Sequence, residues 1–176
     1  TFILFLLIHL NSCSFKTAND EISISKRQVL VNNNPYLIKG VCYHPVPVGS
    51  DQRNFSDLER DLKLMTKVGV NIIRVYVPIS DFNILDKIDS AGIKGITSFC
   101  YNQDGNFYIL SVSFLEYINK FKNHNAILLW ELGNEYNYHP EWFKNDLSNW
   151  YHALNQAADL IHENDPHHPV STAHGE

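Results

Sequence analysis

The chain has 176 residues, of which 44% are hydrophobic and 12% aromatic, and its formal net charge is −5. This composition is typical of a globular protein with enough apolar mass for a sizeable core. The mild acidity gives no electrostatic reason to expect nucleic acid as a partner. Three cysteines are too few for a disulfide scaffold. We interpret Cys42 and Cys100, in separate predicted strands, as small buried hydrophobic residues.

The chain opens with a segment that is typical of exported proteins. Residues 2–10 are apolar except for His9, which is too short a run to span a bilayer but long enough for a signal-peptide core. The sequence Leu-Asn-Ser-Cys at residues 10–13 resembles a bacterial lipobox, whose cysteine is lipidated. We therefore expect an incomplete lipoprotein-type signal segment over residues 1–13 and a polar spacer over residues 14–27. The alternative is a buried N-terminal strand with an incidental cysteine.

If Cys13 is lipidated, the protein is exported and anchored to a bacterial membrane, in the periplasm or at the cell surface.

After the spacer, residues 28–31 and 36–39 predict two strands around a turn at residues 32–35, which contains three asparagines and a proline. The second strand is expected to continue to His44, before Pro45.

The first predicted helix follows a capping signal. Ser56 and Glu59 have the spacing of a capping box, in which the two side chains bond reciprocally to backbone N–H groups. Apolar residues then recur at helical spacing up to Gly69, namely Leu58, Leu62 and Met65.

Residues 70–77 predict a second buried strand, rich in β-branched residues and interrupted by Arg74. A buried arginine needs a partner. Arg74 is therefore either half of a structural ion pair or a residue of a substrate site.

Further elements follow in alternation. The sequence predicts a short helix over residues 84–90, a strand over 93–100 and a helix around 114–121. A run of apolar residues at 126–130 predicts a strand buried on both faces, which breaks at Gly133 and ends in Asn134 and Glu135.

An aromatic loop comes next, and its rings could form platforms for a sugar or pack against the rim of the sheet; they are Tyr136, Tyr138, Trp142 and Phe143. A long helix with one apolar stripe then precedes a fifth strand that begins at residue 170.

Each interval between the five main strands suits a helical crossover, which predicts a parallel sheet with right-handed connections. The expected fold class is α/β, specifically the N-terminal part of a (β/α)8 TIM barrel with about strands 1–5. A full barrel needs on the order of 250 residues, more than this chain supplies. In such a barrel the carboxyl ends of the strands face the active site, where Glu135 is predicted to lie.

Three segments resemble the catalytic barrel of glycoside hydrolase family 2, or of a related clan A family. They are Leu-Ile-Lys-Gly-Val-Cys-Tyr-His at 37–44, Gly-Val-Asn-Ile-Ile-Arg-Val-Tyr at 69–76 and Trp-Glu-Leu-Gly-Asn-Glu at 130–135. The resemblance implies that residues 28–176 form the N-terminal part of a glycosidase barrel. It also implies an oligo- or polysaccharide substrate.

The resemblance implies a role for each matching residue. Glu135 matches the general acid/base of a retaining mechanism, Asn134 the residue that holds the substrate 2-hydroxyl, and Arg74 the arginine that orders the carboxylates. The family's nucleophile follows a seventh strand, beyond this sequence. Glu176 does not match it.

His44, which ends the first barrel-type strand, and Tyr136, on the aromatic loop after Glu135, are further candidates for substrate binding. No pair of histidines has the spacing of a zinc protease with an adjacent Glu, and we expect neither a metal nor a cofactor. Two other functions remain open: glycosyl transfer of the glucanosyltransferase type, and non-catalytic glycan binding by a lipoprotein.

Overall fold

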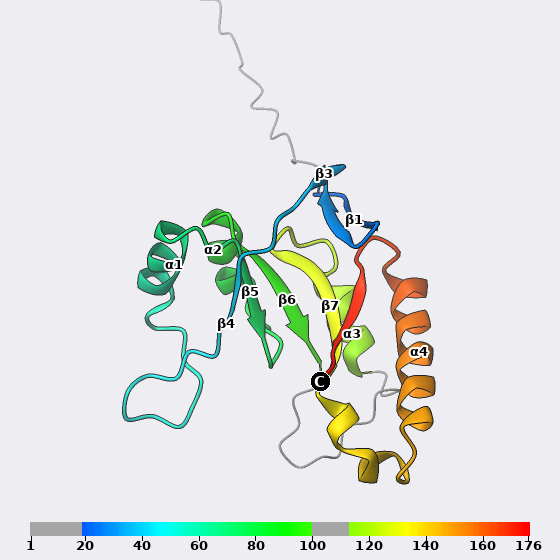
Figure 1. Cartoon of the computed structure of the whole chain (residues 1–176). Coiled ribbons are helices and arrows are strands. Elements are labelled where there is room, and N and C mark those ends of the chain that lie inside the picture. Colours follow the sequence, from blue (N-terminus) through cyan, green and yellow to red (C-terminus); the bar gives the residue numbers. More distant parts are fainter. Residues whose placement is uncertain (1–18, 100–112) are drawn as a thin grey trace, which may run out of the picture.

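The computed structural model describes residues 19–99 and 113–176, so Cys13 and Cys100 lie outside the described residues. Two sheets are present in this part of the chain (Figure 1). The small sheet is antiparallel, with order β1 (Ile22–Ser25), β2 (Gln28–Val31) and β3 (Asn34–Pro35). The large sheet is parallel and follows chain order: β4 (Gly40–Cys42), β5 (Ile72–Val75), β6 (Lys94–Ser98), β7 (Ile127–Asn134) and β8 (Val170–Ala173).

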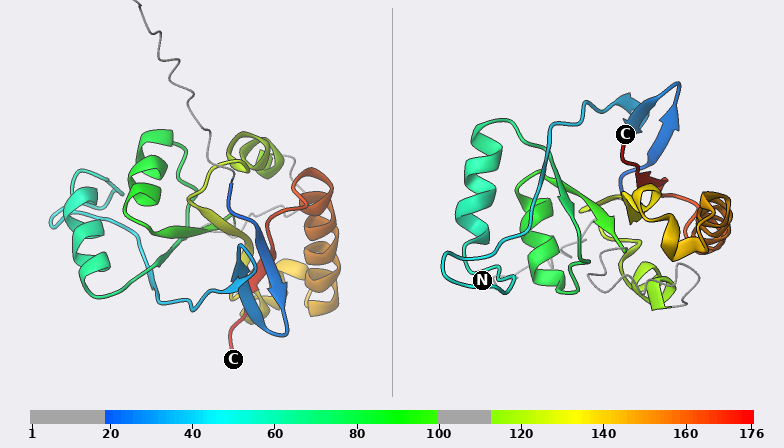
Figure 2. Two further views of the ribbon diagram at one scale, coloured as in Figure 1. Left: turned by 90° about the horizontal axis from the view of Figure 1, so that it is seen from above. Right: turned by 60° about the horizontal axis from the view of Figure 1, so that its bottom comes forward.

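Helices connect the consecutive strands of the large sheet. They are α1 (Leu58–Lys67), α2 (Phe82–Ser90), α3 (Ser113–Phe121) and α4 (Leu147–Asn164). They lie on one side of the sheet, and the β1–β2 hairpin lies on the other (Figure 2). The predicted parallel α/β architecture is therefore confirmed. None of the helices in the described part of the chain is long and apolar enough to cross a bilayer.

Alternation along β5 explains how one strand serves both sides of the sheet. Ile73 and Val75 are each 1% exposed and belong to the large core beneath the helices. Ile72 points the other way, into a smaller cluster beneath the hairpin. Arg74 shares that second face with Ile72 but lies closer to the carboxyl end of the strand. Polar side chains can therefore gather there without entering the core beneath the helices.

The β1–β2 hairpin covers the amino-terminal end of the sheet (Figure 1). Ile22 is 7% exposed and packs with Ile72, Leu128 and Leu129. Beside it, the Asp20 carboxylate forms an ion pair with the buried Lys94 ammonium at 2.5 Å. Residues 22–25 of the predicted polar spacer (residues 14–27) therefore form β1, in which Ile22 has apolar neighbours far away in the sequence.

Two local predictions in the first βα unit are also wrong. Residues 36–39 do not form a strand, because the Asn71 amide accepts from Lys39 N–H at 2.8 Å and donates to Leu37 C=O at 2.9 Å in place of a ladder. Ser56 does not cap α1. The N-cap is Asp57, without a side-chain cap bond, whereas the Ser56 N–H donates to the Asn54 carboxamide at 2.7 Å.

Cys42 is exposed, so its interpretation as a buried residue is wrong. It lies in β4, which pairs only with β5 and forms the edge of the described sheet. Val41 on the same strand is 39% exposed. An edge strand with exposed apolar side chains is a surface suited to a further strand.

A buried polar network joins β7 to the segment after α4. Asp165 is 1% exposed and accepts from Trp130 Nε1 at 2.7 Å and from His168 Nδ1 at 2.8 Å. Burial alone would raise the pKa of Asp165. The hydrogen bond and charge of His168 and the bonds from Trp130 and the His167 N–H outweigh burial, so this pKa lies below its usual value.

We expect Asp165→Ala to lower the free energy of unfolding by about 3 kcal/mol, because Trp130 and His168 lose a buried charged acceptor. The folded-state pKa of Asp165 is depressed. Its contribution to stability is therefore fully present above the unfolded pKa of about 4 and is lost as pH falls through the folded pKa. Urea unfolding of the full-length protein at several pH values measures both effects. Asp159→Ala, on the exposed face of α4, is the control and should change little. Equal effects would contradict the role of the network.

Candidate active site

The candidate site begins with an ion pair inside the parallel sheet. Arg74 on β5 donates from Nε to both Glu131 oxygens, at 2.9 and 3.0 Å, and from Nη2 to Oε1 at 2.6 Å. The two side chains are 16% and 7% exposed. Of the two roles that the sequence left open for Arg74, the structural ion pair is therefore present. The second role, in a substrate site, stays a prediction.

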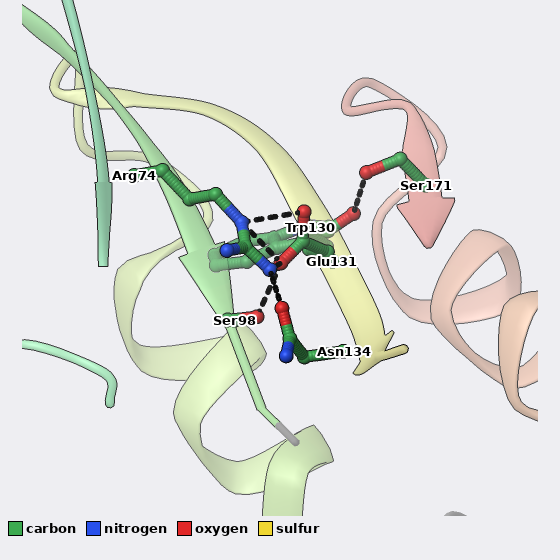
Figure 3. Close-up of polar contacts among 6 residues, drawn as sticks. All are labelled: Arg74, Ser98, Trp130, Glu131, Asn134 and Ser171. Atoms are coloured by element: carbon green, nitrogen blue, oxygen red, sulfur yellow. Dashed lines mark hydrogen bonds and ion pairs between the residues drawn. The ribbon is translucent and has the colours of Figure 1, made fainter. Parts of the chain in front are cut away.

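Arg74 also contacts the end of β7. Its Nη2 donates to Asn134 Oδ1 at 2.8 Å, while Ser98 Oγ on β6 donates to Glu131 Oε1 at 2.5 Å (Figure 3). Three neighbouring parallel strands thus each contribute polar side chains to one cluster at the carboxyl half of the sheet. The cluster, made of Arg74, Ser98, Glu131 and Asn134, is called the polar cluster below.

The charge of Arg74 is held in place by its surroundings. Burial alone would lower the pKa of Arg74, but the hydrogen bonds and negative charge of Glu131 raise it above the usual value. The guanidinium carbon also lies 4.6 Å from the centre of the Tyr76 ring, a cation–π distance. Arg74 is therefore a permanently charged group whose donors are aimed at Glu131 and Asn134.

Glu135 follows the polar cluster directly and turns the chain. Its backbone is left-handed, with φ 57° and ψ 29°, and its N–H donates to the Ala173 carbonyl at 2.8 Å. A non-glycine residue in this region costs of order 1–3 kcal/mol and persists only where neighbouring structure enforces it. Glu135 is exposed at the carboxyl end of the sheet. Its carboxylate thus stands where a ligand can approach.

Gly133 allows the strand to reach Asn134. Its φ is +79°, and a Cβ placed on it would lie 2.6 Å from a Trp150 ring carbon of α4. The β7–β8 register shifts between Glu131 and Asn134, where the strand is irregular. β7 therefore does not break at Gly133, as the sequence suggested, but continues through this glycine to Asn134.

The loop after β7 separates its aromatic rings into two groups. Tyr136 is only 4% exposed, and its ring packs against Trp142, Phe143 and Trp150 at centroid distances of 5.1, 6.0 and 5.0 Å. The Tyr136 ring is therefore packed under the rim, and its predicted role in substrate binding stays a prediction. Tyr138 and Trp142 are 53% and 38% exposed and remain accessible to a flat ligand.

The loop is attached to the end of β8. The Asn137 amide bonds reciprocally with Gly175, donating to its carbonyl at 2.9 Å and accepting from its N–H at 2.9 Å. The Tyr138 hydroxyl donates to the Glu176 backbone carbonyl. The loop and the segment after β8 therefore hold each other beside Glu135.

His44 lies apart from these contacts. It follows β4 and is exposed, and within residues 19–99 and 113–176 no hydrogen bond or ion pair joins it to Arg74, Asn134 or Glu135. Nor does the described part of the chain contain a group of three or more His, Cys, Asp or Glu side chains that could hold a metal ion. The structure thus brings together three of the five predicted catalytic and substrate-binding residues.

Glu131 and Ser98 are site residues that the sequence analysis missed. The signal for Glu131 was present, since it is a charged residue inside the same apolar strand that ends in Asn134 and Glu135. Burial of an unpaired charged side chain costs free energy. A buried arginine on one strand and a buried glutamate on another strand of the same sheet are therefore expected to form an ion pair. Ser98 carried no comparable signal.

Comparison with known proteins adds to this geometry. No protein-family model matches the chain. In sequence it is similar to a β-galactosidase from Pseudoalteromonas haloplanktis, with 26% identity over 65% of this chain and 12% of that protein. In fold it is similar to a β-glucuronidase from Parabacteroides merdae, with TM-score 0.66, 20% identity, and coverage of 87% of this chain and 20% of that one.

A GH2 β-galacturonidase from Eisenbergiella tayi is similar in fold at TM-score 0.65 and 25% identity, over 88% of this chain and 28% of that one. The chain therefore spans only a part of the length of each of these proteins. The resemblance to glycoside hydrolase family 2 is confirmed by these similarities, in sequence to a β-galactosidase and in fold to a β-glucuronidase and a β-galacturonidase.

Proposed function

We propose that this chain is the first part of a (β/α)8 barrel in a retaining β-glycosidase. The observation that carries the proposal is Glu135, exposed at the carboxyl end of β7 directly after an Asn134 that Arg74 contacts. Five parallel strands in chain order and an edge strand suited to a further neighbour support the barrel. The remaining strands would lie beyond this sequence.

In this proposal Glu135 acts first as an acid and then as a base. As the bond between the anomeric carbon and the leaving oxygen breaks, Glu135 gives its proton to that oxygen, and a second carboxylate about 5 Å away attacks the carbon. Glu135 then takes a proton from water, which attacks the same carbon and releases the second carboxylate. We assign that nucleophile to the seventh strand, outside this chain.

Asn134 binds the sugar beside the reacting carbon in the same proposal. Its carboxamide oxygen already accepts from Arg74. Its nitrogen has no hydrogen-bond partner among residues 19–99 and 113–176, so it is the group available to a substrate. A hydrogen bond from this nitrogen to the 2-hydroxyl oxygen would strengthen as the oxocarbenium-like transition state forms. Tyr138 and Trp142 are the exposed rings that a sugar unit on the leaving-group side could stack against.

The experiment that tests this function uses the full-length protein and aryl β-galactosides, β-glucuronides and β-galacturonides. We expect hydrolysis of at least one of them, and proton NMR of the first product should show the β-anomer, as retention requires. Release of the α-anomer would contradict the retaining mechanism. Products that lengthen when an acceptor sugar is added would favour glycosyl transfer. Binding of oligosaccharides without any turnover would favour a glycan-binding lipoprotein.

We also propose that the protein is exported and anchored through Cys13. The apolar run before it and the lipobox-like sequence at residues 10–13 support this proposal. Growth of expressing cells with radioactive palmitate should label the protein, and the label should be lost in Cys13→Ala. Cys42→Ala, which removes an exposed cysteine of the sheet, is the control and should keep the label. Persistence of the label in Cys13→Ala would refute the anchor.

A further inference from the structure

We propose that Glu131 is a positioning residue, which fixes the direction of the Asn134 carboxamide through Arg74 and so favours sugars with a hydrogen-bond acceptor at position 2. This inference rests on the proposed glycosidase function. Its evidence is the polar cluster, whose residues come from three adjacent strands of the parallel sheet (Figure 3).

Glu131 is placed to hold Arg74 and not to react itself. Its side chain is 7% exposed, and its Oε1 accepts from Arg74 Nε and Nη2 and from Ser98 Oγ. Oε2 accepts from Arg74 Nε at 3.0 Å. A carboxylate engaged in this way has its lone pairs occupied by fixed donors. Glu131 and Glu135 thus have different roles. Glu131 holds Arg74 inside the sheet, and Glu135, at the exposed carboxyl end of the sheet, is the proposed acid/base.

Arg74 transmits this constraint to Asn134. A guanidinium carries only donors, so the atom of Asn134 that it contacts at 2.8 Å must be the carboxamide oxygen. The nitrogen then points away from Arg74, toward the end of the strand (Figure 3). Asn134 is thereby limited to donating to a ligand at that edge. Without its hydrogen bonds to Glu131, the Arg74 guanidinium can rotate. The Asn134 carboxamide can then present either its oxygen or its nitrogen to a ligand.

The test compares two substrates of the full-length protein, a 4-nitrophenyl β-glycoside that it hydrolyses and the 2-deoxy analogue of that glycoside. For Glu131→Gln, which keeps the shape and removes the charge, we expect kcat/KM to fall about 10-fold or more on the first substrate, the worth of one hydrogen bond. On the 2-deoxy analogue the fall should be about 2-fold or less, since it lacks the oxygen that Asn134 would bind.

Two further variants keep the test decisive. Ser98→Ala removes one donor to Glu131, and we expect this variant to fold. It should change the ratio of the two kcat/KM values in the same direction as Glu131→Gln does, but by a smaller factor. Ser171→Ala is the matched control, because Ser171 pairs with Glu131 across β7 and β8 but its hydroxyl donates to the Trp130 carbonyl. This variant should leave the ratio unchanged.

The outcomes separate this inference from the function on which it rests. Equal losses on both substrates in Glu131→Gln and Ser98→Ala would overturn the positioning role and leave the glycosidase function standing. Absence of hydrolysis by the wild-type protein on every glycoside would overturn the proposed function, and this inference with it. A larger loss on the 2-hydroxyl substrate than on the 2-deoxy analogue in these two variants supports both.

Discussion

Glu135→Ala in the full-length protein is expected to lose about 10²–10⁴-fold in kcat on natural disaccharides, the usual contribution of general acid catalysis. The leaving group of such a substrate is a sugar alkoxide, which needs a proton as the bond breaks. An activated aryl glycoside, such as a dinitrophenyl glycoside, has a leaving group that needs no proton. The rate at which this substrate forms the glycosyl-enzyme should therefore change little. Release of the sugar from the enzyme then becomes limiting, and a burst of dinitrophenol should precede slow turnover.

Two controls belong to this prediction. Glu135→Gln retains the length of the side chain at a left-handed backbone position but cannot donate a proton as a carboxylic acid does, so it should behave as the alanine variant does. Glu141→Gln changes an exposed carboxylate of the same loop and should leave both activities near wild type. Equal losses on good and poor leaving groups, in variants that remain folded, would contradict the assignment of Glu135.

Gly133→Ala is expected to lower the free energy of unfolding by about 3 kcal/mol. Two effects add in this substitution. A residue with a Cβ at φ +79° costs about 1–2 kcal/mol, and the new methyl group lies 2.6 and 2.7 Å from two carbons of the buried Trp150 ring. Overpacking of this kind costs typically 1–3 kcal/mol. Chemical denaturation of the full-length protein measures the total.

Gly69→Ala is the matched control for that prediction. Gly69 has nearly the same φ, +81°, but a Cβ placed on it meets nothing within 4 Å. It should therefore show the backbone cost alone, about 1 kcal/mol. Equal destabilisation by the two substitutions would mean that contact with Trp150 contributes nothing. It would then remove the packing explanation for Gly133.

Order and type of the main elements could be predicted from the sequence because their signals are local. β-branched runs and apolar residues at helical spacing identify β5, β6, β7 and the helices between them without knowledge of their neighbours. β1 differs, since only Ile22 of its four residues is buried. That burial depends on β5 and β7, which lie far away in the sequence.

The candidate site could be predicted in part for the same reason. Arg74 and the Asn134–Glu135 pair can be identified from the sequence because they are polar residues at the ends of buried strands. The partner of Arg74 is set by the register between β6 and β7, which contains a bulge and could not be read from spacing. Tyr136 shows a further limit. Whether its ring points to solvent or into the core depends on the left-handed turn at Glu135, which periodicity does not reveal.

Azide rescue of Glu135→Ala tests the central claim most directly. Azide attacks the anomeric carbon without general-base help, so it should restore turnover of an aryl β-glycoside in this variant of the full-length protein and have no such effect on wild type. In a retaining enzyme the product should be the β-glycosyl azide, identified by NMR and mass spectrometry. Recovery of turnover with this product is the result that our account predicts. Loss of activity that azide does not relieve, on either class of leaving group, would contradict it.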